Sequence, residues 1–224
     1  MDRISIINDL INYNGYTSYL EIGVRNPDVC FNKITCNNKT SVDPCYEVKE
    51  AIVDFKNESD DFFKQLDEGK LKFKKDFKWD IIFIDGLHLS FQVERDIINS
   101  LNHLSPNGSI VIHDCLPPTL DHAREDFYDL NTSAGGNWNG TVWKAIYKFR
   151  ATRPDLNMYV VDTDWGVGVI TFGSQVCCQY DNSFFEYRQF EKNKKDYLNL
   201  ISVETFSKLM TKNIYGTSGT SNVL

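Results

Sequence analysis

Short hydrophobic runs alternate along the chain with segments in which hydrophobic residues recur every three to four positions. The runs are rich in β-branched and aromatic residues and stop at glycine, proline or acidic residues, which is typical of buried strands. They predict strands at residues 19–23, 40–44, 52–55, 80–86, 109–114, 158–161 and 168–172. The segments with helical spacing predict helices at residues 4–14, 90–104, 140–150 and 194–211, and a further helix that starts near residue 59.

Strands and helices therefore alternate over most of the sequence. This order is typical of βαβ units, and it predicts an α/β fold: a doubly wound, mostly parallel sheet of Rossmann-like type with helices on both faces. The last two strands are close enough in sequence to form an antiparallel hairpin at the edge of the sheet. We expect one domain over residues 1–180, a helical or irregular extension of it over 181–215, and a flexible tail over 216–224.

Composition narrows the class of protein. The chain has 224 residues, of which 42% are hydrophobic, and a formal net charge of −7, as expected for a globular domain with a sizeable core. The acidic balance argues against nucleic acid or an anionic membrane as partner, because both attract basic surfaces. No apolar run approaches the about 20 residues that a membrane helix needs, and the first residues lack a signal-peptide pattern. We therefore expect a cytoplasmic protein.

The parallel strands end in polar motifs. Glu21 and Gly23 end the first strand, Asp43 the second, and Asp85 and Asp114 end the two longest hydrophobic runs. The carboxyl ends of parallel strands meet at one edge of a sheet, and open α/β sheets bind ligands there. The sequence therefore predicts a polar, ligand-binding edge.

The spacing of these residues favours a nucleoside ligand. Asp43 follows Glu21 by 22 positions, close to the about 20 expected between a glycine turn and a ribose-binding acid. The further glycines that a pyrophosphate requires after Gly23 are absent. A cofactor without pyrophosphate, such as S-adenosylmethionine, fits better, and its cationic groups favour acidic surroundings. An oxidoreductase or epimerase that binds NAD or a nucleotide sugar is the alternative, although it needs that glycine-rich turn.

An ordered series of motifs gives the chain a family resemblance. The motifs lie at residues 19–27, 41–44, 59–63, 82–88, 104–108, 112–114 and 138–146. Together they resemble the class I S-adenosylmethionine-dependent methyltransferases, in the branch that contains sugar and small-molecule O-methyltransferases. The resemblance implies an enzyme that transfers a methyl group to a hydroxyl of a sugar, a glycan or a similar polyol.

The resemblance also implies which residues surround the cofactor. Glu21 and Gly23 would flank its amino-acid portion, and Asp43 would bind the ribose hydroxyls. Ser59 and Asp60 would lie near the adenine.

The first loop departs from the family pattern. Arg25 and Pro27 stand where that pattern has glycine. We therefore expect this loop to have a different shape from that of the family.

Transfer to an aliphatic hydroxyl needs a base or a Lewis acid, because such a hydroxyl is a poor nucleophile at neutral pH. His88 follows the strand that ends at Asp85, so His88 is the candidate base, and Asp85 is a candidate catalytic and cofactor-contacting residue. Relatives with a divalent cation imply a metal site at Asp85, His113 and Asp114, for Mg²⁺ or Mn²⁺. The alternative is that the two histidines only lie in a loop or cap a strand.

Aromatic and polar side chains late in the chain are candidates for the acceptor site, because aromatic faces stack on sugar rings and polar groups bind hydroxyls. The candidates are Trp138, Asn139, Trp143, Asp164 and Trp165. Trp138 and Trp143 do not share a helical face, so a place in the core stays open for one of them. A non-enzymatic binding module with this fold is a second alternative, and a homo-oligomer stays open.

Overall fold

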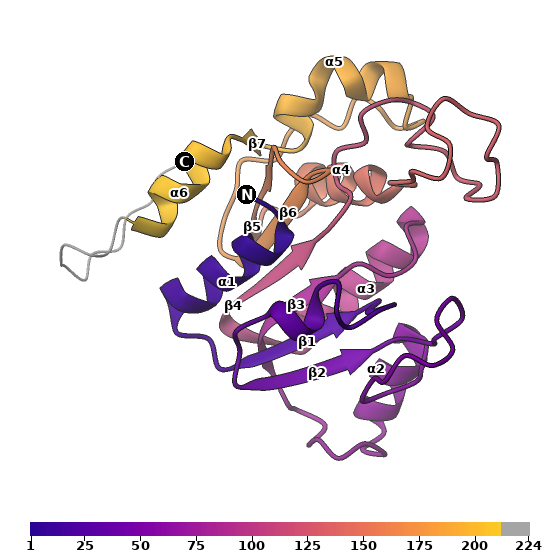
Figure 1. The fold of residues 1–224 in the computed structure, drawn as a ribbon. Coiled ribbons are helices and arrows are strands. Elements are labelled where there is room, and N and C mark those ends of the chain that lie inside the picture. The colour runs from indigo at the N-terminus through magenta and orange to yellow at the C-terminus, as the bar shows by residue number, and fades with distance from the viewer. Residues whose placement is uncertain (212–224) are drawn as a thin grey trace.

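Seven strands form one sheet in the computed structural model, which describes residues 1–211 (Figure 1). The strands are β1 (Ser18–Ile22), β2 (Asn38–Val42), β3 (Trp79–Ile84), β4 (Leu104–Ile112), β5 (Leu156–Val161), β6 (Val167–Phe172) and β7 (Leu200–Ile201). Their order across the sheet is β2-β1-β3-β4-β6-β5-β7. Strands β2, β1, β3 and β4 are mutually parallel, whereas β6 is antiparallel to β4 and β5. The predicted fold class is confirmed.

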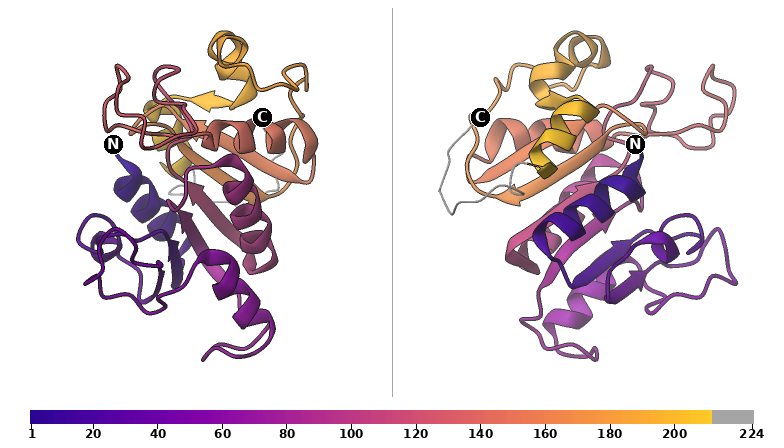
Figure 2. Two further views of the ribbon diagram at one scale, coloured as in Figure 1. Left: turned by 90° about the vertical axis from the view of Figure 1, so that its right-hand side faces the viewer. Right: turned by 60° about the vertical axis from the view of Figure 1, so that its left-hand side comes forward.

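Helices cover both faces of the sheet (Figure 2). They are α1 (Arg3–Asn14), the 3₁₀ helix η1 (Phe31–Lys33), α2 (Ser59–Asp67), α3 (Ser90–Asn102), α4 (Val142–Thr152), α5 (Tyr187–Tyr197) and α6 (Val203–Thr211). One hydrophobic cluster joins α1 and α6 to one face, and the other joins α2, α3, α4 and α5 to the opposite face. In β3, Phe83 belongs to the first cluster and Ile82 to the second, because successive side chains of a strand point to opposite faces.

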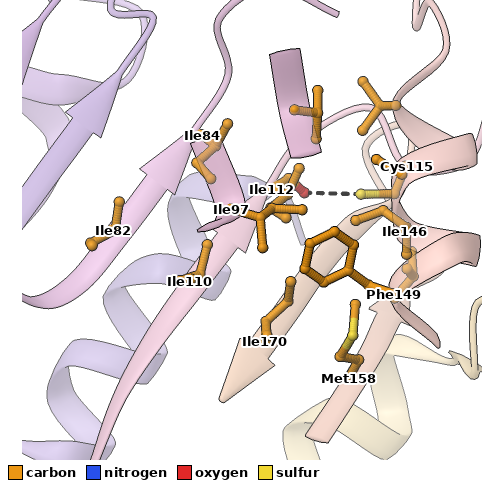
Figure 3. Close-up of a cluster of buried hydrophobic side chains, with 14 of the residues drawn as sticks. Ile82, Ile84, Ile97, Ile110, Ile112, Cys115, Ile146, Phe149, Met158 and Ile170 are labelled. Atoms are coloured by element: carbon orange, nitrogen blue, oxygen red, sulfur yellow. Dashed lines mark hydrogen bonds between the residues drawn. The ribbon is translucent and has the colours of Figure 1, made fainter. Parts of the chain in front are cut away.

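Figure 3 shows part of the larger hydrophobic cluster, where isoleucines of the sheet pack against α3 and α4. Each isoleucine labelled in the figure is at most 2% exposed. Burying one such side chain contributes about 1.5–3 kcal/mol. This packing holds β3 and β4 rigidly, and so it also fixes the polar residues that follow them.

The strand predicted at residues 52–55 is reduced to a single bridge between Val42 and Phe55. The reason lies at Asp54, whose carboxylate accepts the Ser41 N–H at 2.9 Å and the Ser41 hydroxyl at 2.8 Å. A side chain thus takes the place of a backbone acceptor beside β2. In addition, Ile52 is 89% exposed, so no hydrophobic face stabilises a longer strand.

The helix predicted at residues 194–211 is instead two helices, α5 and α6, separated by β7. Asn199 ends the first with a left-handed φ of +46°, and its side chain donates to the Met158 carbonyl oxygen at 3.0 Å. The predicted tail at 216–224 lies outside the described residues. Within residues 1–211, no helix has the length and apolar character needed to cross a membrane.

The parallel strands β1 to β4 all end at the same edge of the sheet, which we call the carboxyl edge. The turn between β5 and β6 lies at this edge as well, because Val167 and Gly168 pair next to the end of β4 and β5. The start of α1 also reaches it, since the Arg3 N–H donates to Asp164 in that turn at 2.9 Å. Segments far apart in sequence therefore meet at one place.

Candidate active site

Two strand ends bring together three side chains of types that can bind a metal ion. Asp85 directly follows β3, and His113 and Asp114 directly follow β4. His113 Nδ1 lies 3.4 Å from Asp85 Oδ1 and 3.1 Å from Asp114 Oδ2. One ligand atom from each residue lies within 4.8 Å of the other two. The structure thus brings together the three residues predicted to hold a metal.

His88 joins them from the loop before α3. Its Nε2 lies 3.4 Å from Asp85 Oδ1, and its Nδ1 lies 3.4 Å from Asp114 Oδ2. Nδ1 is also 3.1 Å from the Trp138 carbonyl oxygen. Because that carbonyl can only accept, a neutral His88 carries its proton on Nδ1 and leaves Nε2 as the basic atom.

The backbone around His88 is tightly fixed. The Thr141 N–H donates to the His88 carbonyl oxygen at 2.7 Å. Gly140 has a φ of +60°, and a Cβ there would lie 2.1 Å from the same carbonyl oxygen. Only glycine fits in this position. The close contact of residues 140 and 141 with the His88 backbone therefore fixes the position of the imidazole.

Arg3 and Asp164 complete the group. Arg3 Nη1 donates to Asp164 Oδ2 at 3.0 Å, and Arg3 Nε lies 3.8 Å from Asp85 Oδ2. Arg3 Nη1 is also 3.4 Å from His113 Nε2. We name the following six residues the charge cluster: Arg3, Asp85, His88, His113, Asp114 and Asp164.

Opposite charges set the protonation of this cluster. Burial on its own would raise the pKa of Asp85, but the imidazoles of His113 and His88 outweigh it and lower that pKa. Burial opposes a charge on His88, yet its hydrogen bond with Asp85 and the charge of Asp114 outweigh burial and raise the pKa of His88. Asp85 is therefore firmly ionised, and His88 is a stronger base than a free imidazole.

The carboxylate at the end of β1 has different surroundings. Glu21 is 1% exposed and accepts a hydrogen bond from the Tyr19 hydroxyl. Burial raises the pKa of Glu21 to about 7, and the Tyr19 hydrogen bond offsets this only in part. Gly23 follows with a φ of +86°, and a Cβ there would lie 2.3 Å from the Asp85 carbonyl oxygen. Glycine thus lets the ends of β1 and β3 pack backbone to backbone.

Asp43, at the end of β2, holds the loop that follows β1. Its Oδ2 accepts the Arg25 N–H at 2.8 Å, and its Oδ1 accepts the Cys45 N–H at 2.6 Å. Arg25 has a φ of +52°, a conformation that favours glycine. The difference in shape from the loop of the family stays a prediction. A carboxylate has about four acceptor positions, so Asp43 can still accept two more hydrogen bonds.

Ser59 and Asp60, at the start of α2, take no part in the charge cluster. The Ser59 hydroxyl donates to Asp96 at 2.6 Å, and Asp60 pairs with Arg95 at 2.9 Å. Both partners belong to α3. These contacts fasten α2 to α3, and the place of Ser59 and Asp60 near an adenine stays a prediction.

Several of the predicted acceptor residues lie beside the charge cluster. The Trp138 ring stacks on His88 with 5.1 Å between centroids and 20° between planes. Asn139 Nδ2 donates to Asp114 Oδ1 at 2.9 Å and to the Trp165 carbonyl oxygen at 3.4 Å. Asn139 is 0% exposed, so it supports Asp114 from behind and does not wall an open site.

Trp143 takes the place in the core that stays open for one of the two tryptophans. It is 1% exposed in the first turn of α4, and its ring lies 4.3 Å from that of Phe190 in α5. Trp138 lies in the loop before α4, whereas Trp143 lies within α4 and packs into the larger hydrophobic cluster. Trp143 is a core residue and does not line the acceptor site.

Comparison with known proteins agrees with this geometry. Residues 34–115 match a family model described as a methyltransferase domain. The fold is similar to the SAH-bound methyltransferase PaMTH1 from Podospora anserina, at 16% identity over 78% of this chain and 80% of that one, with a TM-score of 0.50. The chain has the fold of the class I, S-adenosylmethionine-dependent methyltransferases, and its residues 34–115 match a methyltransferase domain. The family resemblance read from the sequence is confirmed at this level.

Two further structures are similar to this methyltransferase. Cofactor-bound Rv0187 from MTB is 10% identical over 78% of this chain and 82% of that one, with a TM-score of 0.50. The O-methyltransferase from Bacillus cereus in complex with SAH is 15% identical over 76% and 82%, with a TM-score of 0.49. No curated protein sequence matches the chain significantly.

The donor set of the methyltransferase is suitable for a divalent cation. Two carboxylates and one imidazole, from Asp85, Asp114 and His113, are ligands that first-row divalent metals accept. A further oxygen lies next to Asp114: Asn139 Oδ1 is buried and has no hydrogen-bond partner among residues 1–211. Such an orphaned oxygen is costly unless something else binds it.

Sequence reasoning missed Arg3 as a member of the site. A signal was present, because a positive charge at the first position of a helix is opposed by the helix dipole and calls for a compensating partner. Arg3 opens the first helix of the methyltransferase. The sequence alone does not say that this helix starts at the carboxyl edge, where Asp85 and Asp164 lie.

Proposed function

We propose that this methyltransferase transfers the methyl group of S-adenosylmethionine to a hydroxyl group of a sugar, a glycan or a similar polyol. The observation that carries the proposal is the position of His88, an imidazole that is 20% exposed and lies between two carboxylates at the carboxyl edge, next to the face of Trp138. A hydroxyl acceptor needs a base of this kind, and a sugar ring suits an aromatic wall.

Three residues at the ends of β1 and β2 would hold the cofactor. Glu21 offers a buried carboxylate to the ammonium group, and the backbone of Gly23 would flank the same amino-acid portion of the cofactor. Asp43 retains two acceptor positions for the ribose hydroxyls. Ser59 and Asp60 are the proposed neighbours of the adenine, four and five positions beyond Phe55, whose carbonyl accepts the Asp43 N–H at 3.1 Å.

Methyl transfer is an in-line displacement, so the main task of the protein is to align the acceptor oxygen with the S–CH₃ bond. As the O–CH₃ bond forms and the S–CH₃ bond breaks, His88 Nε2 accepts the hydroxyl proton. Asp85 and Asp114, each 3.4 Å from a ring nitrogen of His88, then stabilise the imidazolium. Their negative charge makes His88 a better proton acceptor at the moment of transfer.

Asp85, His113 and Asp114 would hold a divalent cation, and the imidazole favours Mn²⁺ or a softer ion over Mg²⁺. A bound cation would act as a Lewis acid on the acceptor oxygen. A cytoplasmic location and a homo-oligomer stay predictions from the sequence.

Calorimetric titration with S-adenosylmethionine, followed by transfer of a labelled methyl group to a panel of sugars, tests the proposal. We expect cofactor binding, sugar methylation, and a fall in rate of about a hundredfold in His88→Ala. His103→Gln is the matched control, because His103 lies at the opposite end of β4. Absence of cofactor binding at millimolar concentration, or full activity of His88→Ala, would contradict the proposal.

A further inference from the structure

The segment between β4 and α4 exposes hydrophobic side chains to an unusual degree. We call residues 117–138 the acceptor-side loop, because it ends at Trp138 beside His88. Leu120, Phe127, Tyr128 and Leu130 are 62%, 39%, 83% and 57% exposed. A group of exposed large apolar side chains on one loop marks a binding surface more often than chance.

Aromatic rings on this loop form a continuous series that starts at the proposed base. His88 stacks on Trp138 with 5.1 Å between centroids. Trp138 lies 5.2 Å from Phe127, and Phe127 lies 5.3 Å from Tyr128. The series therefore runs from the partly buried charge cluster outward to solvent, which is the path that an acceptor larger than one ring would follow.

The loop is held in place by Arg124. Its guanidinium donates to five backbone carbonyl oxygens, at distances of 2.7–3.4 Å; they belong to Asp121, Asp126, Phe127, Gly135 and Asn137. The Trp138 indole N–H donates to the Arg124 carbonyl oxygen at 2.8 Å. All five N–H donors of the Arg124 guanidinium therefore form hydrogen bonds that fix the conformation of the loop. A surface ordered in this way loses less entropy when a ligand binds.

The charge of the loop restricts its ligand. Between residues 117 and 138 there are four acidic side chains, Asp121, Glu125, Asp126 and Asp129, and Arg124 is the one arginine or lysine. Its guanidinium faces backbone carbonyls, so it is not available to a phosphate. Lys144 of α4 pairs with Glu125 at 2.9 Å, whereas Asp121, Asp126 and Asp129 form no ion pair within residues 1–211. Polyanionic acceptors, such as nucleotide sugars or coenzyme A thioesters, are repelled by such an acidic surface.

We propose that Trp138, Phe127 and Tyr128 form a platform that binds the saccharide units attached to the sugar that is methylated. The ligand class is a neutral or amino-bearing oligosaccharide, whose C–H faces stack on the rings and whose hydroxyls meet the surrounding acids. This inference rests on the proposed function, since it assigns the acceptor class of the same site.

Saturation-transfer NMR and titration of the tryptophan fluorescence with maltotetraose, cellotetraose and the tetramer of glucosamine test the platform on the whole protein. We expect at least one of the three to bind. Tyr128→Ala and Phe127→Ala should each weaken that binding about fivefold to tenfold. Phe172→Ala should leave it unchanged: this ring is 42% exposed, like Phe127, but ends β6 at the opposite edge of the sheet.

UDP-glucose and a sulfated tetrasaccharide serve as anionic probes, and we expect neither to compete. Arg124→Gln should weaken oligosaccharide binding although Arg124 touches no sugar, because the platform loses its fixed shape. The inference is overturned if no tetrasaccharide binds, if the Tyr128 and Phe127 variants bind like the wild type, or if an anionic probe binds most tightly. Calorimetry with S-adenosylmethionine is run separately, so a protein that binds sugar without cofactor would count against methyl transfer and not against the platform.

Discussion

Glu21 and Asp85 are carboxylates at the ends of two neighbouring parallel strands, and the structure gives them opposite properties. Burial raises the pKa of Glu21 to about 7, since its nearest partner is the neutral Tyr19 hydroxyl. Burial acts on Asp85 in the same direction, but the imidazoles of His113 and His88 outweigh it and lower the pKa of Asp85. Position in the sheet is therefore not what distinguishes them.

The difference lies in what the rest of the chain places beside each strand end. Next to Asp85, the start of α1 contributes Arg3, and the end of β4 contributes His113. Within residues 1–211, Glu21 forms no ion pair with a cationic side chain. The β1 side thus suits a cationic ligand that brings its own charge, whereas the β3 side suits proton transfer in a network that is already balanced.

The largest effect is expected from removing the charge on the β3 side. Asp85→Asn keeps the shape of the side chain but removes the counter-charge of His88 and His113. We expect the methyl-transfer rate to fall about a hundredfold to a thousandfold, with little change in the affinity for S-adenosylmethionine. Single-turnover kinetics measures both.

Asp155→Asn is the control for that experiment, because Asp155 pairs with Arg153 at the opposite edge of the sheet. Circular dichroism verifies that both variants fold. A rate within threefold of the wild type in Asp85→Asn would show that the two carboxylates do not differ in function.

A smaller effect is expected on the β1 side, and it depends on pH. Without cofactor, Glu21 binds a proton as the pH falls through about 7, and the protonated form no longer attracts an ammonium group. We therefore expect S-adenosylmethionine to bind about fivefold to tenfold more weakly at pH 6 than at pH 7.5. The higher pH of the two stays below the pKa of a free α-amino group, about 7.7–8.0, so the ammonium group of the cofactor keeps its charge at both.

Glu21→Gln should abolish that pH dependence and bind the cofactor weakly at both values. Calorimetry in buffers of different ionisation enthalpy should also detect proton release on binding to the wild type near pH 7. An affinity that does not change with pH in the wild type would mean that the ammonium group lies away from Glu21.

The smallest effect is expected from replacing Arg3, the cation that lies next to Asp85 and forms no ion pair with Glu21. Arg3 lies close to both Asp85 and Asp164, and its positive charge opposes a divalent cation bound at Asp85. After dialysis against EDTA, we expect Arg3→Gln to bind Mn²⁺ about fivefold more tightly than the wild type, a difference of about 1 kcal/mol.

Electron paramagnetic resonance of free Mn²⁺ measures this affinity. Arg25→Gln is the matched control, since Arg25 forms an exposed pair with Glu47 at 2.8 Å, outside the charge cluster. Weaker binding of Mn²⁺ by Arg3→Gln would mean that Arg3 supports the metal ligands and does not compete with the ion.

The parts of the molecule that follow from local rules could be predicted from the sequence. Hydrophobic runs located β3 and β4, and parallel strands bring Asp85, His113 and Asp114 to one edge whatever the details of packing. Phe55 was predicted in a strand because hydrophobicity does not reveal that the Asp54 side chain bonds to Ser41.

Contacts between distant segments could not be predicted. Nothing near Arg3 in the sequence indicates that it meets Asp164, which is 161 positions away. The core position of Trp143 depends on its contact with Phe190 in α5, a helix whose start was not foreseen.

The acceptor-side loop is anchored at both ends through main-chain atoms. The Leu116 N–H donates to the Trp165 carbonyl oxygen at 2.8 Å, and the Thr141 N–H donates to the His88 carbonyl oxygen at 2.7 Å. Between the anchors, Trp138, Asn139 and Gly140 must stay, because they contact His88 and Asp114. The rest of the loop takes no part in these two hydrogen bonds, so grafting another sequence in its place would change the surface offered to an acceptor while His88, the proposed base, keeps its position.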